Sequence, residues 1–436
     1  MTVTEPLVID DGPIFDQRYY VEHGYPFALW DRLRAEAPVH RHERPGFPPF
    51  WAVTRHDLVR EVEGRRETFV NGGPILRMRS HEDLAAFETF KRRQAERFGW
   101  DPRVPIDMIF CDGEEHFSLR RLTMRSFTPS AMRRLEHDLV ELSRSFVGEF
   151  VERARAAGGA PVDLVANLSV SVPLATICGL IDVPRERWSQ ILAWTDLLSF
   201  PTVAALHVRP GETASDVRRR LGAEFHAFRA GLIADRRARS EPGDDLVSLL
   251  VDATLDGRPL SDQELHSYVN LLIFAGNETT RNAITGGVRA LLQHPEQARL
   301  LADDPYRHLG TAVEEILRWV SPVVHFARTV AHDTELGGTA LRKGDTIVLF
   351  YPSANRDERV FPEPYRFDVT RTPNPHLAFG YGPHFCLGAN LARWELRAVF
   401  RELIPHLPHL RLAGEATWHT DLHVYAATEQ PVSWVD

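Results

Sequence analysis

The chain has 436 residues, of which 43% are hydrophobic and 25% are charged, so it can bury the core of one large domain or two ordinary ones. Its net charge of −9 argues against nucleic-acid binding, which depends on basic side chains that neutralise phosphates. Three widely spaced cysteines, no signal-like start and no long apolar run argue against a disulfide framework and a membrane anchor, and we expect a cytoplasmic location.

The first part of the chain mixes short strand-like and helical segments. Residues 49–62, "PFWAVTRHDLVREV", predict a short strand followed by a helix. Residues 71–110 are polar and irregular, with a short helix expected around 84–97. A connection of this length is usually functional or disordered, and we expect it to act as a mobile lid.

Helical periodicity dominates from about residue 116 to residue 300. Apolar residues recur at three- and four-residue spacing in three stretches, at 116–127, 131–158 and 214–240. The stretch 260–295 then predicts one long helix, with Ser261 as N-cap, Glu264 completing a capping box and Pro295 ending it. Its middle is apolar on most faces, which indicates a helix through the centre of the domain.

The last quarter of the chain adds a small β portion. A helix is expected over 311–320, followed by short strands within 325–351 and again within 422–434. The prediction is a mainly α protein with a minor β portion, organised as a single domain over residues 1–436.

Cys386 lies in a glycine-punctuated loop, "AFGYGPHFCLGANLARWE", at the start of an expected helix. Free N–H groups and the helix dipole at such a position lower a thiol pKa. The residue could be a small buried hydrophobe or a nucleophile, although His384 is not obviously aimed at the sulfur to act as a base. A structural zinc site would need further cysteine or histidine ligands close by, and the sequence has none there.

The loop closely resembles the haem-binding loop of the cytochromes P450. The residues that carry the resemblance are Phe379, Gly380, Gly382, His384, Cys386 and Gly388, followed by Leu391, Ala392 and Arg393. The resemblance implies a cytochrome P450 fold with a long central helix crossing over haem b, whose iron is held by the Cys386 thiolate. It also implies that Phe379, His384 and Gly388 contribute to cofactor binding.

Two further segments match the family in the expected order. Glu315 and Arg318 resemble its Glu-x-x-Arg pair, with Arg366 expected as the third member of a buried network; alone, the pair could equally be an exposed ion pair. The segment "AGNETT" resembles the oxygen-activating part of the long helix. There Ala275 and Gly276 would adjoin the cofactor, and Glu278 and Thr279 would be the catalytic acid and alcohol, unless the segment is only a polar helical stripe.

Four basic residues match the positions that bind haem propionates in the family. His116 and Arg120 are four residues apart on one predicted helix face, and Arg328 and His384 lie in later segments. Without the resemblance, each would be taken as a solvated surface charge.

The pocket for substrate can be predicted from helical phase and from segment order. Leu271, Phe274, Ala275 and Thr279 share one face of the long helix. A second wall is expected from three apolar residues after the following helix, Val323, Val324 and Phe326. The lining is apolar, which predicts a hydrophobic small-molecule substrate. Arg77, Arg79 and His81 in the lid could meet a substrate carboxylate, although we expect them to be solvated.

The resemblance implies a monooxygenase that inserts one atom of O2 into a terpenoid, sterol or branched lipid. Electrons would come ultimately from NAD(P)H, through a separate ferredoxin reductase and ferredoxin, with Arg121, Arg125 and Arg393 as a basic docking patch. The alternatives are a peroxide-driven haem-thiolate enzyme or dehydratase, a haem protein that binds ligands without turnover, and a helical scaffold without haem.

Overall fold

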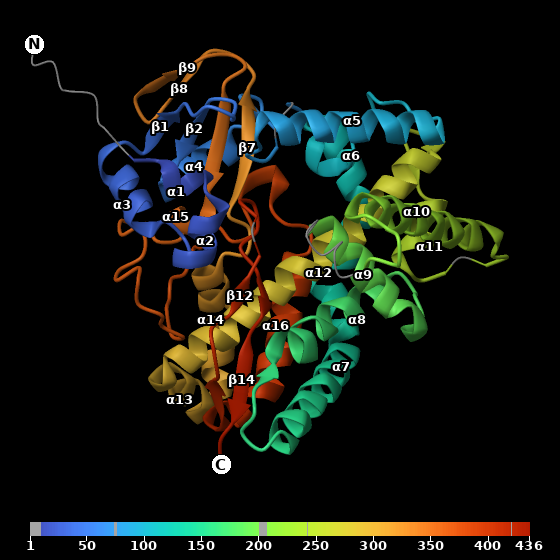
Figure 1. The fold of residues 1–436 in the computed structure, drawn as a ribbon. Coiled ribbons are helices and arrows are strands. Elements are labelled where there is room, and N and C mark those ends of the chain that lie inside the picture. Colours follow the sequence, from blue (N-terminus) through green and yellow to red (C-terminus); the bar gives the residue numbers. More distant parts are fainter. Residues whose placement is uncertain (1–9, 74–75, 200–206, 242, 420) are drawn as a thin grey trace, which may run out of the picture.

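The structure, a computed structural model, describes residues 10–73, 76–199, 207–241, 243–419 and 421–436 (Figure 1). As predicted, helices dominate it and the sheets are small. The helices are α1 (Gly12–Phe15), α2 (Gln17–His23), α3 (Phe27–Glu36), α4 (His56–Gly64), α5 (His81–Phe98), α6 (Gly113–Met124), α7 (Pro129–Ala156), α8 (Ser171–Leu180), α9 (Trp188–Ser199), α10 (Ala214–Ala238), α11 (Leu246–Asp252), α12 (Asp262–Gln293), α13 (Pro295–Asp303), α14 (Pro305–Val320), α15 (Tyr351–Ala354) and α16 (Ala389–Leu403).

The strands form two main sheets and three two-stranded pairs. They are β1 (Val39–His42), β2 (Phe50–Val53), β3 (Phe69–Val70), β4 (Val162–Asp163), β5 (Thr254–Leu255), β6 (Arg258–Pro259), β7 (His325–Val330), β8 (Thr334–Leu336), β9 (Thr339–Leu341), β10 (Thr346–Phe350), β11 (Leu410–Leu412), β12 (Thr417–Trp418), β13 (Ala427–Glu429) and β14 (Pro431–Trp434). The larger sheet has the order β1-β2-β10-β7-β3, and a smaller one has the order β11-β14-β4. Figure 1 shows the larger sheet on one side of the molecule and the helical part on the other.

The long helix α12 runs through the helical part, where α8, α9, α10, α14 and α16 pack against it (Figure 1). It begins as expected: the Ser261 hydroxyl accepts from the Glu264 N–H at 3.3 Å, and the Glu264 carboxylate accepts from the Ser261 N–H at 2.7 Å. His294 follows its last turn and Pro295 opens α13. Most of its length is buried, because apolar neighbours surround it on nearly all sides.

Several predicted boundaries shift once packing is seen. The helix in the lid region, α5, is longer than the predicted one because Ser80 caps it at the front and Gly99 closes it in a left-handed conformation. The helix expected from residue 311 already begins at Pro305. Pro at the first helical position fits a helix start, and the Asp304 carboxylate caps it.

A buried charge network joins α14 to the segment before the cysteine loop. The Glu315 carboxylate accepts from Arg318 Nε at 2.8 Å and from Arg371 Nε at 3.1 Å. Both Glu315 and Arg318 are completely buried, so the alternative of an exposed surface pair is wrong. The prediction that Arg366 is the third partner is also wrong. The Arg366 side chain pairs with exposed Glu363, and only the Arg366 carbonyl accepts hydrogen bonds from Arg318 and Arg371.

Within the described ranges, no helix combines the length and the apolarity that crossing a membrane requires.

Candidate active site

The cysteine loop turns back on itself so that Cys386 lies just before α16. The Cys386 N–H donates to the Phe379 carbonyl at 2.9 Å, and the Ala389 N–H donates to the Cys386 carbonyl at 3.3 Å. The thiol is exposed, although α16 behind it packs against α7, α12 and α14. The loop therefore holds one sulfur atom at an accessible position next to the helical core.

Two positions of this loop require glycine for a reason that the sequence did not reveal. Gly380 and Gly382 both have a φ of 69°, in the left-handed region that favours glycine. A Cβ on Gly382 would lie 2.4 Å from the carbonyl oxygen of Glu63, at the end of α4. At Gly382 the closely approaching group is therefore the backbone of α4.

The expectation that the helix start lowers the pKa of Cys386 is wrong for the chain by itself. Burial raises the pKa of this thiol, while the Gly388 N–H and the charges of Arg120 and Arg393 act in the opposite direction. The residue has exposed surface, so the desolvation comes from the protein groups packed around it. A thiol in this setting ionises readily when it coordinates a cation.

The four predicted propionate-binding residues are brought together from three segments, α6, β7 and the cysteine loop. The rings of His116 and His384 stack with centroids 4.0 Å apart, and Arg120 donates to the Phe385 carbonyl at 2.6 Å. Burial lowers the pKa of His384, and the positive charges of Arg328 and Arg120 lower it further, against the effect of Asp112. Basic side chains that lie this close repel one another when charged, and a bound anion would relieve that repulsion.

Arg328 lies on β7 and is held by a buried carboxyl that we did not predict. Its Nη2 donates to Glu63 Oε1 at 3.1 Å, and the Tyr351 hydroxyl donates to the same oxygen at 2.8 Å. Burial raises the pKa of Glu63 to about 7, against the effects of Arg328 and Tyr351. The partner was missed because α4 and β7 are far apart in the sequence.

The middle of α12 has accessible surface where its neighbours leave it uncovered. Ala275 is exposed and Phe274, Gly276 and Thr279 are half-buried, whereas Glu278 is buried. The Thr279 hydroxyl donates to the Ala275 carbonyl at 3.1 Å, which is the back-bond that threonine can make in a helix. The helix stays continuous across this segment.

The predicted substrate residues differ in how much surface they present. Phe326 and Val323 are half-buried, with Phe326 against His423 at a centroid distance of 4.9 Å. Leu271 belongs to the main helical core, and Val324 is completely buried beside Trp30 and Phe350. Leu271 and Val324 therefore lie behind the predicted substrate wall and contribute little to its surface.

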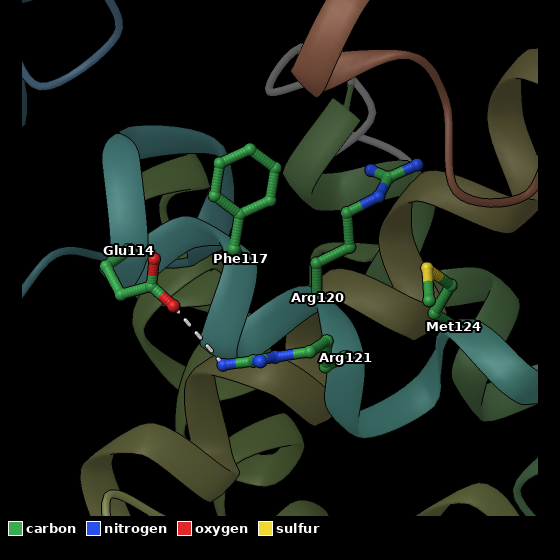
Figure 2. A pocket seen from close by; sticks show the side chains of 5 residues that line it. All are labelled: Glu114, Phe117, Arg120, Arg121 and Met124. Carbon is green, nitrogen blue, oxygen red and sulfur yellow. Dashed lines mark hydrogen bonds and ion pairs between the residues drawn. The ribbon is translucent and has the colours of Figure 1, made fainter.

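A hollow of about 350 Å³ opens beside α6, next to the cysteine loop (Figure 2). Its lining combines Glu114, Phe117, Arg120, Arg121 and Met124, and Figure 2 shows Arg121 turned toward Glu114, with which it pairs at 3.4 Å. Arg121 and Arg125 are exposed. Arg393, expected in the same patch, is instead half-buried in an ion pair with Glu314 at 2.7 Å.

A buried acid behind α12 was not predicted from the sequence. Glu395 on α16 is 2% exposed, and burial raises its pKa to about 8 despite hydrogen bonds with Thr176 and Thr280. An isolated glutamate within a helical stretch gave no signal, because its burial depends on how α8, α12 and α16 pack together.

We predict that Glu395 makes unfolding depend on pH. Its folded pKa of about 8 exceeds the unfolded value of 4.5, so the folded state binds the extra proton between these limits. Stability is therefore lost as pH rises from about 5 to 8, by a few kcal/mol at about 1.4 kcal/mol per pKa unit. Denaturant unfolding of Glu395→Gln across this range should lack that loss, whereas the exposed control Glu152→Gln should retain it. Parallel profiles for Glu395→Gln and the unsubstituted protein would contradict the prediction.

The residues present fit haem. The Cys386 sulfur accepts a hydrogen bond from the Gly388 N–H. The basic cluster around His384 suits the two haem propionates. The accessible surface of α12 is apolar apart from Thr279. The described residues contain no group of three or more His, Cys, Asp or Glu side chains able to hold a metal. The fold and the site residues suit the class of haem-thiolate proteins.

Comparison with known proteins agrees with that class. The family model for cytochrome P450 matches residues 79–417, and the chain belongs to the cytochrome P450 family. A steroid C26-monooxygenase of Rhodococcus jostii is 35% identical over 95% of this chain and 82% of its own length. A methyl-branched lipid omega-hydroxylase of Mycobacterium tuberculosis is 37% identical over 92% of this chain and 89% of its own.

Solved structures show the same fold. A Mycobacterium marinum cytochrome P450 in complex with pseudoionone has a TM-score of 0.83 and 33% identity, with 100% of each chain covered. A cytochrome P450 of Novosphingobium aromaticivorans also has a TM-score of 0.83, at 31% identity over 97% of each chain. The protein is therefore a cytochrome P450 monooxygenase, an oxidoreductase that uses haem and O2.

Proposed function

We propose that this monooxygenase hydroxylates a hydrophobic terpenoid, steroid or branched lipid, with Cys386 as the axial ligand of haem b. The observation that carries the proposal is the accessible Cys386 sulfur, which receives the Gly388 N–H in a loop closed by the bond to Phe379. Haem b supplies reductive activation of O2 and transfer of one oxygen atom to a C–H bond. The names of the relatives support the substrate class, since they describe steroid and methyl-branched lipid oxidation.

The protein residues divide the remaining work. His116, Arg120, Arg328 and His384 would hold the haem propionates, because they form one basic cluster beside the cysteine loop. Phe379 and Gly388 would contact the proximal side. Phe379 packs against Phe385 at 6.1 Å and a Cβ on Gly388 would lie 4.0 Å from the sulfur, so both lie beside the thiol.

On the other side, Ala275 and Gly276 would face the cofactor and Phe274, Val323 and Phe326 the substrate. Thr279 would present its hydroxyl to the reacting oxygen and Glu278 would pass protons from solvent to this site. Support comes from the accessible stripe on α12 and from the Thr279 hydroxyl, which already donates to Ala275 and so keeps its lone pairs free to accept.

We expect Thr279→Ala to bind substrate but to uncouple reductant consumption from product formation. Loss of the hydroxyl removes a proton-transfer step worth about 10²–10⁴-fold, so hydrogen peroxide should replace hydroxylated product. The measurement is product and peroxide formed per reductant consumed. Thr279→Ser should restore coupling, and Thr285→Ala is the control, because Thr285 makes the same back-bond to Arg281 at 3.0 Å elsewhere on α12. An unchanged product yield in Thr279→Ala would remove this role.

Electrons are proposed to reach the site from NAD(P)H through a ferredoxin reductase and a ferredoxin. The exposed Arg121 and Arg125 at the end of α6, beside exposed Met124, offer a basic and partly apolar surface near the cysteine loop. Arg393 is excluded from this surface by its ion pair with Glu314.

A further inference from the structure

Two arginines at the entrance to the lid region stand out by their lack of partners. Arg77 and Arg79 are both half-buried. Among the described residues, neither forms an ion pair within 4.0 Å, and neither guanidinium donates a hydrogen bond. Several buried arginines have carboxylate partners, as Arg318 does with Glu315 and Arg328 does with Glu63. Buried Arg356 has no carboxylate partner but donates to two backbone carbonyls. A guanidinium carries five N–H donors, so an unpartnered, partly desolvated pair is costly.

Backbone hydrogen bonds place both arginines beside β7. The Ala327 N–H donates to the Leu76 carbonyl at 2.8 Å, and the Met78 N–H donates to His325 Nε2 at 2.9 Å, so this segment runs along β7. Leu76 and Met78 are buried against the protein. Arg77 and Arg79, the next residue after each of these, are only half-buried.

The surroundings of Arg77 include the predicted substrate wall. Burial lowers the pKa of His325 to about 3 and that of His423 well below its ordinary value, and in both the charge of Arg77 adds to the effect. The ring of His423 packs against Phe326. Arg77 thus lies close to the residues that flank Phe326, and its charge reaches an otherwise apolar wall.

Arg79 lies beside the lid helix. Its guanidinium covers the ring of Phe87 on α5 at 4.6 Å. Burial lowers its pKa and the neighbouring charge of Arg77 lowers it further, while Asp421 and Asp83 act in the opposite direction. The acids near this pair, which include half-buried Asp107 beside Arg77, lie within electrostatic range but beyond ion-pair distance.

We propose that Arg77 and Arg79 bind the carboxylate of the substrate, which makes the substrate a hydrophobic carboxylic acid. This inference rests on the proposed function. Two adjacent guanidiniums match a carboxylate, which arginine can bind through two parallel hydrogen bonds. One monoanion suits the place, because three carboxyls already lie near the pair and a more highly charged group would meet repulsion from them.

The location also sets the direction of binding. Along β7, Arg328 approaches His384 and the cysteine loop, whereas Phe326 and His325 lie progressively further back, at about 3.3 Å per residue. A carboxylate beside Arg77 is therefore held away from Cys386. The hydrocarbon chain extends toward Ala275 and Thr279, so oxidation falls on a carbon remote from the carboxyl group.

The test compares acids with their neutral esters on the purified full-length holoprotein. Equilibrium dialysis gives Kd for farnesoic acid and methyl farnesoate, and for palmitate and methyl palmitate. We expect each acid to bind at least about tenfold more tightly than its ester, as charge-assisted hydrogen bonds imply. Arg77→Gln and Arg79→Gln should each raise the Kd of the acids about tenfold and leave the esters unchanged.

The control variants are Arg92→Gln and Arg93→Gln, which remove the same charge from exposed positions on α5. They should keep the preference for acids. Arg77→Lys should retain part of it, because lysine keeps the charge but loses the planar fork. A thermal melt of each variant checks that it is folded.

Equal binding of acid and ester by the unsubstituted protein, or an acid-to-ester ratio unchanged in both arginine variants, overturns the inference and leaves the monooxygenase proposal standing. A lower melting temperature with an unchanged ratio assigns the arginines to stability and also overturns it. If neither acids nor esters bind while the thiolate-haem spectrum is normal, the hydrophobic-substrate proposal and this inference both fail.

Discussion

Cys386→Ala is expected to lose both the thiolate spectrum and monooxygenase activity. The unsubstituted protein, reduced and exposed to carbon monoxide, should show the red-shifted Soret band that marks a cysteine thiolate as axial ligand. Alanine provides no donor atom, and no other thiol can replace it at this position, since Cys111 and Cys178 are buried elsewhere. Product formation should fall to background, because the thiolate donates the electron density that favours O–O cleavage.

The two remaining cysteines are matched controls. Burial raises the pKa of Cys111 and that of Cys178 to about 12, so both should stay neutral and inert. Cys111→Ala and Cys178→Ala should retain the spectral band and activity. A normal band in Cys386→Ala, or its loss in either control, would show that the ligand is misassigned.

Glu315→Ala is expected to destabilise the protein by about 3–5 kcal/mol, the range for a buried ion pair that loses one partner. Its carboxylate accepts from Arg318, from Arg371 and from the Asp368 N–H at 2.9 Å. Removing it leaves two guanidiniums buried without an anion. Chemical denaturation should show the change as a lower midpoint with an unaltered slope.

The neighbouring arginines provide a sharper comparison. Arg371→Ala should cost several kcal/mol, because it removes one side of the same buried network. Arg366→Ala and Glu363→Ala should change stability by about 0.5 kcal/mol or less, since that pair is exposed. A large effect of Arg366→Ala, with little effect of Arg371→Ala, would restore the partner first predicted from the sequence.

Motifs predicted the class of site well because they are short and local. The spacing of Phe379, Gly382, Cys386 and Gly388 identified the family, and Ser261 with Glu264 located the start of the long helix, as the structure confirms. Capping and loop motifs depend on backbone groups only a few residues apart, so the sequence alone can specify them.

Contacts between distant segments were predicted less well. Arg366 was predicted from the resemblance to the family, and only the path of the backbone decides that the guanidinium of Arg371 reaches Glu315 instead. The pairing of Arg328 with Glu63 and the burial of Glu395 were missed for a similar reason. Each depends on elements that are far apart in the chain and meet only after folding.

The sequence by itself determined that this is a mainly helical protein of the cytochrome P450 family, and it predicted the Cys386 loop and the Glu278–Thr279 pair as the site. The tertiary structure decided the electrostatics, because a pKa depends on burial and on charges brought close in space. It reversed the expected pKa direction of Cys386. It also left Arg77 and Arg79 half-buried beside the substrate wall without carboxylate partners, where the sequence had indicated two solvated charges.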